Sequence, residues 1–293
     1  MIYYIGPAPA VESTFKLSTV DECLNYFKDH ESLAIDTETQ GRDAHVKKIL
    51  SLQIGDEHNQ YVIDCRYTDI RKFKDLLESK LCIFHNAKFD YKFLKANDIH
   101  VEYIYDTMLA ECVLYAGYES FGYGLKDVAK RYLNVDLDKT TRGDFYKLTS
   151  QPFTDKQIEY AALDVTYLHK IKSIQEAKAK KYDLEYCVNL ENQVVKALAD
   201  IEFNGISFDV VAWLKNAREY ESKQIDIQRD LDNIVINDSV LGKIYKPKYV
   251  QTNLFDLPSR QCSINYSSPS QILKIFKEIG YDVDSTDDRT LSK

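Results

Sequence analysis

Closely spaced β-rich segments in the first half of the chain limit its fold more than any other feature of the sequence. Their apolar, β-branched runs predict strands that follow one another closely along the chain. The predicted strands are 32–39 (SLAIDTET), 48–56 (KILSLQIGD), 60–65 (QYVIDC) and 81–86 (LCIFHN).

Amphipathic segments lie before, between and after these strands, with apolar residues at helical spacing. They predict helices over 20–30, 69–80, 88–98, 106–117 and 124–133. A long helix is expected from Thr154 or Asp155 to about Lys180, because F-T-D-K-Q places a capping residue ahead of an apolar-periodic run. Strands alternating with helices predict an α/β protein.

The second half of the chain changes character after Tyr182. A strong amphipathic helix is expected over 183–205, stopped by Gly205, followed by a second helix over about 210–233. The segment 234–267 is irregular, and a last helix opens at Ser268-Pro269-Ser270 and ends at Gly280. Because 293 residues favour two domains, we expect one domain over 1–182 and a mainly helical region over 183–293.

Two carboxylates, Asp36 and Glu38, follow the apolar part of the first predicted strand. Their spacing of two places both side chains on one face of that strand. Paired acids also occur at Asp136/Asp138 without this context, so the pair is weak evidence by itself. Its position strengthens it, because an ionised pair at the end of a buried strand is costly unless it binds cations or hydrogen-bond donors.

Two further pairs have a spacing that suits a shared site. Asn86 and Asp90 lie where a predicted strand passes into a helix, although a simple helix cap explains that motif as well. Tyr160 and Asp164 lie one turn apart on the long helix, and so would project from one face. An ordinary core tyrosine beside a solvated acid is the alternative there.

Taken in order, D-x-E on a strand, N-x3-D after a later strand and Y-x3-D on a late helix resemble the DEDDy exonucleases. The resemblance covers roughly Leu33 to Ile171, with further similar stretches at 105–114 (YDTMLAECVL), 123–135 (YGLKDVAKRYLNV) and 137–168. It implies a ribonuclease-H-like fold, with a mixed sheet flanked by helices, and a 3′-5′ exonuclease that releases nucleoside 5′-monophosphates.

The resemblance also implies a cofactor and roles for the site residues. Carboxylate oxygens are ligands that Mg²⁺ or Mn²⁺ prefers, and two such ions would relieve the repulsion among four acids. Asp36 would bridge the two ions, Glu38 and Asp164 would complete one, and Asp90 would hold the other. Tyr160 would orient the attacking water, since a phenol of pKa ~10 is a poor base at neutral pH.

Substrate contacts are less constrained by the sequence. Single-strand sites combine aromatic and basic side chains, which makes candidates of Phe121, Tyr123, Arg142 and Lys147, with ordinary loop residues as the alternative. Asn86 is a further candidate for a substrate contact. A second basic and aromatic group could touch duplex phosphate, and an ordinary solvated loop is its alternative; it comprises Lys243, Lys246, Lys248, Tyr245 and Tyr249.

Two groups within the family compete: the proofreading region of family A DNA polymerases, such as DNA polymerase I, and ribonuclease D. The segments 190–210 and 267–280 resemble the junction and the start of the thumb in the polymerases. The chain stops at Lys293, before any palm or fingers, so we expect either part of a polymerase or a separate exonuclease subunit that binds one. An RNA exonuclease and a non-catalytic module that docks DNA or a polymerase are the remaining hypotheses.

Bulk properties constrain the setting and the partners. The net charge of −8 argues mildly against a nucleic-acid partner, although carboxylates that bind cations account for part of it. No segment approaches the roughly 18 apolar residues of a membrane span, and six scattered cysteines lack disulfide-like spacing. We therefore expect a cytoplasmic protein, or one at the site of DNA replication. The resemblance, and not the composition, implies that it acts on DNA 3′ ends and prefers single strands.

Overall fold

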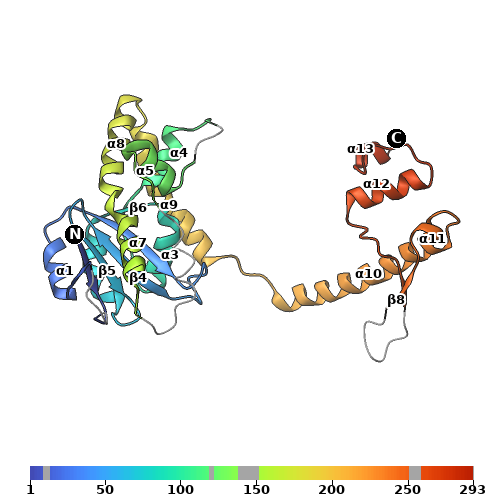
Figure 1. Cartoon of the computed structure of the whole chain (residues 1–293), viewed down its shortest axis with the longest axis horizontal. Coiled ribbons are helices and arrows are strands. Elements are labelled where there is room, and N and C mark those ends of the chain that lie inside the picture. The colour runs from blue at the N-terminus through green and yellow to red at the C-terminus, as the bar shows by residue number, and fades with distance from the viewer. Residues whose placement is uncertain (9–13, 119–121, 138–151, 251–258, 293) are drawn as a thin grey trace. The chain divides into compact units, whose positions relative to one another are not determined.

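The computed structural model describes residues 1–8, 14–118, 122–137, 152–250 and 259–292 (Figure 1). Two compact units make up the chain, Met1–Gly205 and Ile206–Lys293. Among the described helices, none combines the length and the apolar character needed to cross a membrane.

The first unit is built on a seven-stranded mixed sheet with the strand order β2-β1-β5-β4-β3-β6-β7. Pairings of β4 with β3 and with β5 are antiparallel, and the other pairings are parallel. The strands are β1 (Ile2–Ile5), β2 (Lys16–Leu17), β3 (Ser32–Thr39), β4 (Ile49–Gly55), β5 (Gln60–Asp64), β6 (Leu81–Phe84) and β7 (Tyr103–Asp106).

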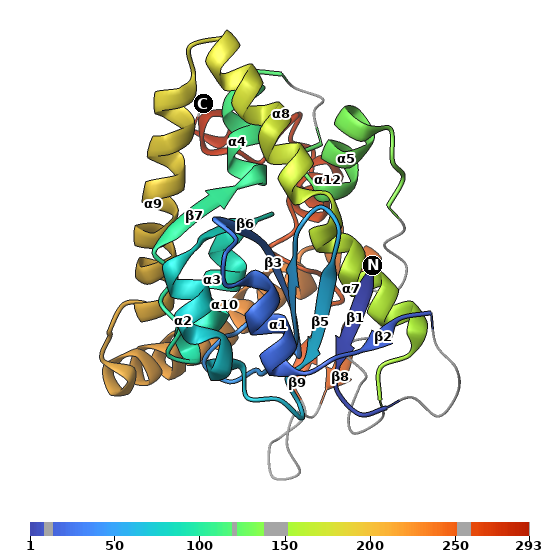
Figure 2. The ribbon, with the colours of Figure 1, turned by 90° about the vertical axis from the view of Figure 1, so that its left-hand side faces the viewer.

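Helices pack on both faces of this sheet (Figure 2), which confirms the predicted mixed α/β fold. On one face, Leu33 and Ile35 of β3 join a core with α1, α2, α3 and α9; on the other, Ala34 packs with α4, α5 and the end of α7. The helices are α1 (Val20–Phe27), η1 (Ile70–Phe73), α2 (Lys74–Ser79), α3 (Ala87–Ala96), α4 (Thr107–Leu114), α5 (Leu125–Leu133), α7 (Asp155–Thr166), α8 (Leu168–Lys181) and α9 (Glu185–Asn204).

In the first unit, the structure differs from the sequence prediction at three short strands and one helix. In the second unit, two strands, Lys248–Val250 and Ser259–Gln261, lie in the segment that was expected to be irregular. The prediction missed β1, β2 and β7, which have only two to four residues each. The long helix expected up to Lys180 is divided at Tyr167 into α7 and α8. Its hydrogen bonding explains the break, because the Thr166 hydroxyl donates to the Ala162 carbonyl at 2.7 Å and such back-bonding bends helices.

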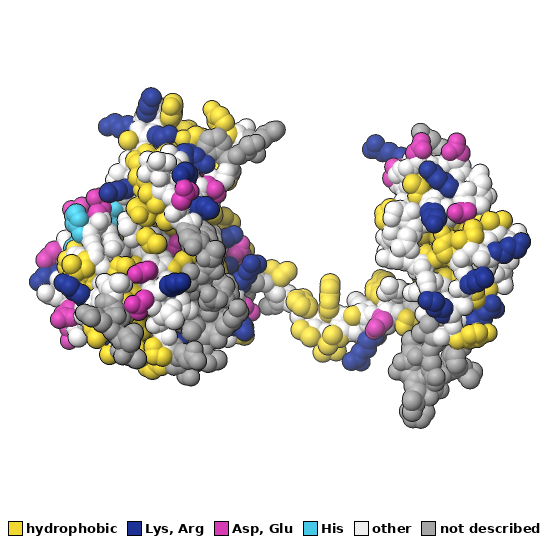
Figure 3. Space-filling view, viewed as in Figure 1, with side chains coloured by type: hydrophobic (Ala, Val, Ile, Leu, Met, Phe, Trp, Pro, Cys, Tyr) yellow, Lys and Arg dark blue, Asp and Glu magenta, His cyan; other side chains and the backbone are white. Residues whose placement is uncertain are grey.

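The second unit contains a long helix and a small cluster of elements. Buried side chains from α10, α11, β9 and α12 form its core, with Val235, Leu241 and Ile275 among them. Much of α10 exposes hydrophobic side chains, including Val211 and Trp213 (Figure 3). The elements are α10 (Val210–Asn237), α11 (Leu241–Ile244), β8 (Lys248–Val250), β9 (Ser259–Gln261), α12 (Pro269–Glu278) and α13 (Asp288–Leu291).

The first unit extends past residue 182, where the sequence analysis placed a domain boundary. Helix α9 packs against α3, α4 and β7. Its buried Val195 and Ala199 belong to the same core as Leu33 and Ile35 of β3. By its contacts, α9 is therefore part of the first unit.

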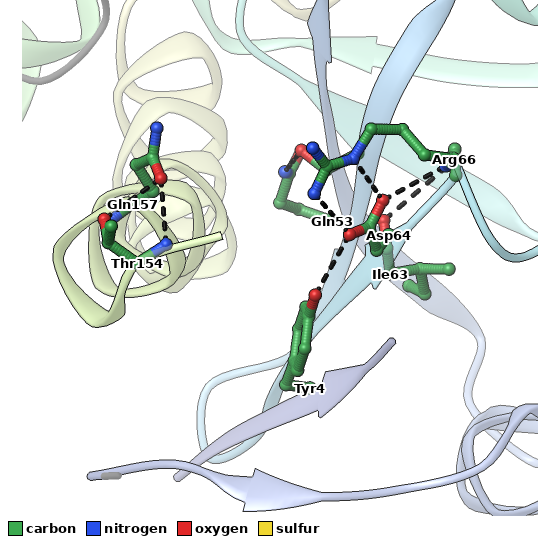
Figure 4. A network of polar contacts seen from close by, with 9 residues as sticks. Tyr4, Gln53, Ile63, Asp64, Arg66, Thr154 and Gln157 are labelled. Carbon is green, nitrogen blue, oxygen red and sulfur yellow. Dashed lines mark hydrogen bonds and ion pairs between the residues drawn. The ribbon is translucent and has the colours of Figure 1, made fainter. Parts of the chain in front are cut away.

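Helix α7 begins with a capping box, as the F-T-D-K-Q motif predicts. The Gln157 N–H donates to the Thr154 hydroxyl at 3.4 Å, and the Thr154 N–H donates to the Gln157 side-chain oxygen at 2.9 Å (Figure 4). Because α7 packs across β3, β4 and β5, this cap fixes the start of a helix that covers the centre of the sheet.

Thr154→Ala should lower the free energy of unfolding of the first unit by about 1 kcal/mol, the usual value of a lost N-cap. Urea denaturation of the full chain, followed by circular dichroism, measures this change. Ser173→Ala is the matched control, since it removes a hydroxyl inside α8 that donates to the His169 carbonyl at 3.0 Å. Equal stability of the two variants would contradict the role given to the cap.

Candidate active site

Strand β3 presents Asp36 and Glu38 on the face that α7 covers. Ala34 lies on this face and Ile35 on the other, so the period of two places both carboxylates on the α7 side. The register with β4 shifts between Glu38 and Thr39, where Leu50 of β4 has no partner in the pairing. Glu38 is buried and Asp36 is half-buried.

Helix α7 brings Asp164 and Tyr160 to the same place. One carboxylate oxygen from each of Asp36, Glu38 and Asp164 lies within 4.8 Å of the others. Tyr160 is buried one turn before Asp164. Three acids at this separation repel one another strongly unless a cation or a proton lies between them.

Asp90 approaches from the other side of β3, on α3. Strand β6 pairs with β3 only over Ser32–Ala34, so the backbone beyond Ala34 needs another acceptor. The Asp90 carboxylate supplies it: Oδ1 accepts the Thr37 N–H at 3.0 Å and the Thr37 hydroxyl at 2.6 Å.

Asp90 is almost completely buried. Burial raises its pKa to about 7, the charge of Asp106 adds to the shift, and the hydrogen bonds from Thr37 oppose it. A carboxyl group in this position is therefore costly to ionise until a cation compensates its charge.

These side chains line one pocket of about 220 Å³. Its lining comprises Asp36, Thr37, Glu38, His85, Asn86, Phe89, Asp90, Met108, Gly124, Leu125, Tyr160 and Asp164. The four carboxylates and Tyr160 expected from the sequence therefore meet in a single place, and Asn86 lies with them.

The other candidate substrate contacts lie elsewhere or outside the described residues. Tyr123 does not line the pocket, and its hydroxyl donates to the Tyr115 carbonyl at 3.3 Å. Phe121, Arg142 and Lys147 lie outside the described residues. Lys243, Lys246, Lys248, Tyr245 and Tyr249 belong to the second unit, where the three lysines are exposed.

The sequence analysis missed several pocket residues, of which His85 is the most polar. Its Nδ1 lies 2.9 Å from the Thr107 hydroxyl, and that hydroxyl donates to the Phe84 carbonyl at 2.9 Å. The Thr107 oxygen must then accept from His85, which places the hydrogen of the neutral ring on Nδ1. The adjacent dipeptide His85-Asn86 was the available signal, because both residues lie in the connection between β6 and α3.

Two other acidic places in the first unit have partners for their carboxylates. Asp64 accepts hydrogen bonds from the Tyr4 hydroxyl at 3.0 Å and from Arg66 Nε at 2.8 Å (Figure 4). A larger pocket of about 590 Å³ lies beside β7, and its acids Glu102 and Glu176 pair with lysines at 3.2 and 2.7 Å. Neither place offers a group of carboxylates for a metal ion.

In the absence of divalent metal, Asp90→Asn should remove a pH-dependent loss of stability. In the unfolded chain the Asp90 carboxyl group has a pKa of about 4, and in the folded chain its pKa is about 7. Between these pH values the folded chain keeps a proton on Asp90 that the unfolded chain has lost. The free energy of unfolding of the wild type therefore falls over this interval, and the loss is complete at higher pH. Thermal melting in EDTA from about pH 5 to about pH 8 should show a growing advantage of the variant.

The control for this experiment is Asp136→Asn, which changes an exposed carboxylate paired with Lys130 at 2.6 Å. The advantage should not grow with pH in that variant. A difference between Asp90→Asn and wild type that stays constant across the pH range would contradict the raised pKa.

Comparison with known proteins agrees with this geometry. The chain is 31% identical over 197 residues to DNA polymerase I of Aquifex aeolicus, covering 61% of this chain and 32% of the polymerase. It is 28% identical over 239 residues to ribonuclease D of Haemophilus influenzae, covering 78% of this chain and 58% of that enzyme. The chain thus spans less than two thirds of the length of either relative.

Solved structures share the fold of the first unit. Brucella melitensis NrnC with bound Mg²⁺ superposes with a TM-score of 0.55 at 22% identity, and NrnC bound to pGG with 0.56 at 23%. Each comparison covers 64% of this chain and 92% of NrnC. Residues 11–178 match the model of a family described as 3′-5′ exonuclease, and the chain belongs to that family.

Proposed function

We propose that this chain hydrolyses the terminal phosphodiester bond at the 3′ ends of DNA and so removes nucleotides one at a time. The reaction would depend on metal and use the pocket between β3, α3 and α7. The observation that carries the proposal is the meeting of Asp36, Glu38, Asp90, Asp164 and Tyr160 around one pocket. Four carboxylates around one pocket are unfavourable unless cations or protons compensate their charge, because like charges repel.

The donor set fits hard divalent cations. Asp36, Glu38 and Asp164 would hold one ion, and Asp36 and Asp90 would hold a second, in accord with the mutual proximity of the first three carboxylates. Mg²⁺ or Mn²⁺ suits carboxylate oxygens, and the Mg²⁺ bound to NrnC supports this choice. When bound, such ions supply a more acidic water and neutralise charge on the scissile phosphate.

The remaining chemistry belongs to the side chains. Tyr160 would hold the attacking water by a hydrogen bond from a fixed position, since it is buried one turn from Asp164. Asn86 and His85, at the end of β6, line the pocket with polar groups that can bind the terminal nucleotide. The products would be nucleoside 5′-monophosphates.

The DNA assignment and a proofreading role are supported by the similarity to DNA polymerase I. We assign exonuclease activity to the first unit and regard the second as similar to the start of a family A polymerase domain. The polymerase would then be a partner, or the rest of a longer protein.

A second candidate, an RNA 3′ exonuclease, is favoured by a specific observation. The similarity to ribonuclease D extends over 78% of this chain, more than the similarity to the polymerase does. The two candidates share the pocket and the hydrolysis and differ in the sugar that the site accepts, because the 2′-hydroxyl distinguishes RNA from DNA.

Asp36→Ala should reduce exonuclease activity by roughly 10³-fold or more, since it removes metal-dependent stabilisation worth several kcal/mol. Tyr160→Phe should reduce it less, by roughly 10–100-fold, because it removes a positioning hydrogen bond only. The assay is shortening of a 5′-labelled single-stranded DNA with Mg²⁺, Mn²⁺ or EDTA. Asp136→Ala, at an exposed ion pair, is the control and should retain wild-type activity; a similar loss in all three variants would refute the site.

Matched DNA and RNA oligonucleotides of one sequence should give a higher kcat/KM for DNA. Both substrates are labelled at the 5′ end and digested under identical metal conditions, so that only the 2′-hydroxyl differs. Faster digestion of RNA would transfer the assignment to the ribonuclease candidate, and resistance of both would leave the docking-module hypothesis.

A further inference from the structure

Asp106 is a buried carboxylate that lies outside the pocket and joins the elements around it. It ends β7 and is 1% exposed. Its oxygens accept four backbone N–H groups, from Asn86 at 3.0 Å, Ala87 at 2.8 Å, Met108 at 2.8 Å and Leu109 at 3.3 Å. These donors occupy the carboxylate and leave no evident position for a metal ion.

The four donors come from two helix N-termini. Met108 and Leu109 belong to the first turn of α4, for which Asp106 is the N-cap. Asn86 and Ala87 begin α3, and within the described structure the Asn86 side chain makes no capping bond of its own. Asp106 therefore caps α3 from a neighbouring strand and α4 from its own, where the positive ends of both helix dipoles favour an anion.

Asn86 shows how tightly this junction is constrained. Its backbone is left-handed, with φ 75° and ψ 53°, a conformation that asparagine tolerates better than most residues. Both its N–H and that of Ala87 point to one carboxylate. The direction in which α3 leaves β6 is thus set by Asp106.

The same helix carries Asp90 one turn later. The Asp90 carboxylate accepts hydrogen bonds from Thr37 on β3. The first turn of α3 therefore connects Asp106, which holds the start of the helix, to β3. Metal ligands must lie within about 0.5 Å of their productive positions. A small shift at the start of α3 would move Asp90 out of range of an ion held by Asp36.

We propose that Asp106 is a positioning residue of the metal site, which fixes Asp90 relative to the carboxylates of β3 and α7 by clamping the N-termini of α3 and α4. This inference rests on the proposed function, because it requires that the pocket binds metal. Asp106 touches neither the ion nor the substrate.

The chemistry of the clamp explains why a carboxylate is needed. All four contacts are donors, and a carboxylate offers acceptors on both oxygens. Oδ1 accepts three of these N–H groups and Oδ2 accepts that of Ala87. An amide in its place would therefore turn its NH₂ group toward at least the Ala87 N–H, donor against donor. A serine would still cap α4 as an N-cap residue, but its shorter side chain could not reach α3.

Two variants follow from this reasoning, Asp106→Asn and Asp106→Ser. Isothermal titration of the full chain with Mn²⁺, without nucleic acid, measures the affinity of the site directly. Both variants should bind Mn²⁺ roughly 10–100-fold more weakly than wild type, the usual effect of removing a group that orients a metal ligand. The Mn²⁺ concentration for half-maximal exonuclease activity should rise by the same factor.

Asn192→Ala is the matched control. The Asn192 side-chain oxygen accepts the Asp106 N–H at 2.7 Å, so this variant removes a buried hydrogen bond at the same residue and leaves the carboxylate clamp in place. Its melting temperature should fall while its Mn²⁺ affinity stays at the wild-type value.

The outcomes separate the two proposals. Wild-type protein that fails to bind Mn²⁺ would overturn the proposed function. Wild-type binding together with unchanged affinity in both folded Asp106 variants would overturn the positioning role alone. An equal loss of affinity in Asn192→Ala, or loss of the folded circular dichroism spectrum in both Asp106 variants, would assign Asp106 to general stability and overturn the positioning role too.

Discussion

The hydrogen bonds from Thr37 to Asp90 hold the two halves of the candidate site together. Strand β3 continues beyond the end of its pairing with β6, and a buried N–H without an acceptor would be costly. A carboxylate from α3 satisfies it. The Asp90 side chain thereby supplies the acceptor that β3 lacks and lines the same pocket as Asp36, Glu38 and Asp164. The same contact stabilises the fold and positions a residue of the candidate site.

The grouped carboxylates repel one another, and a bound cation would reduce that repulsion. Three carboxylates share a space of less than 5 Å and a fourth is buried with a raised pKa. Elsewhere in the first unit, Asp64 forms an ion pair with Arg66. Burial raises the pKa of Asp106 as well, and backbone N–H groups oppose that shift. Carboxylates grouped at one pocket are the form that a binding site for divalent cations takes.

The sequence was informative wherever a local pattern determines the outcome. Strand periodicity placed Asp36 and Glu38 on one face, and helical periodicity placed Tyr160 above Asp164, as the structure confirms. The break at Tyr167 was missed because it arises from one side-chain hydrogen bond of Thr166. The sequence pattern predicts Asp106 only as the start of a helix. Its contacts with Asn86 and Ala87 depend on the packing of β7 beside β6, and residue spacing along the chain carries no information on that packing.

The central claim is that the pocket binds divalent metal through these carboxylates. Anomalous diffraction from crystals of the full chain grown with Mn²⁺ tests it most directly. Peaks surrounded by Asp36, Glu38, Asp164 and Asp90 are the predicted result. An empty pocket at saturating Mn²⁺, with strong peaks at other carboxylates of the chain, would contradict the account.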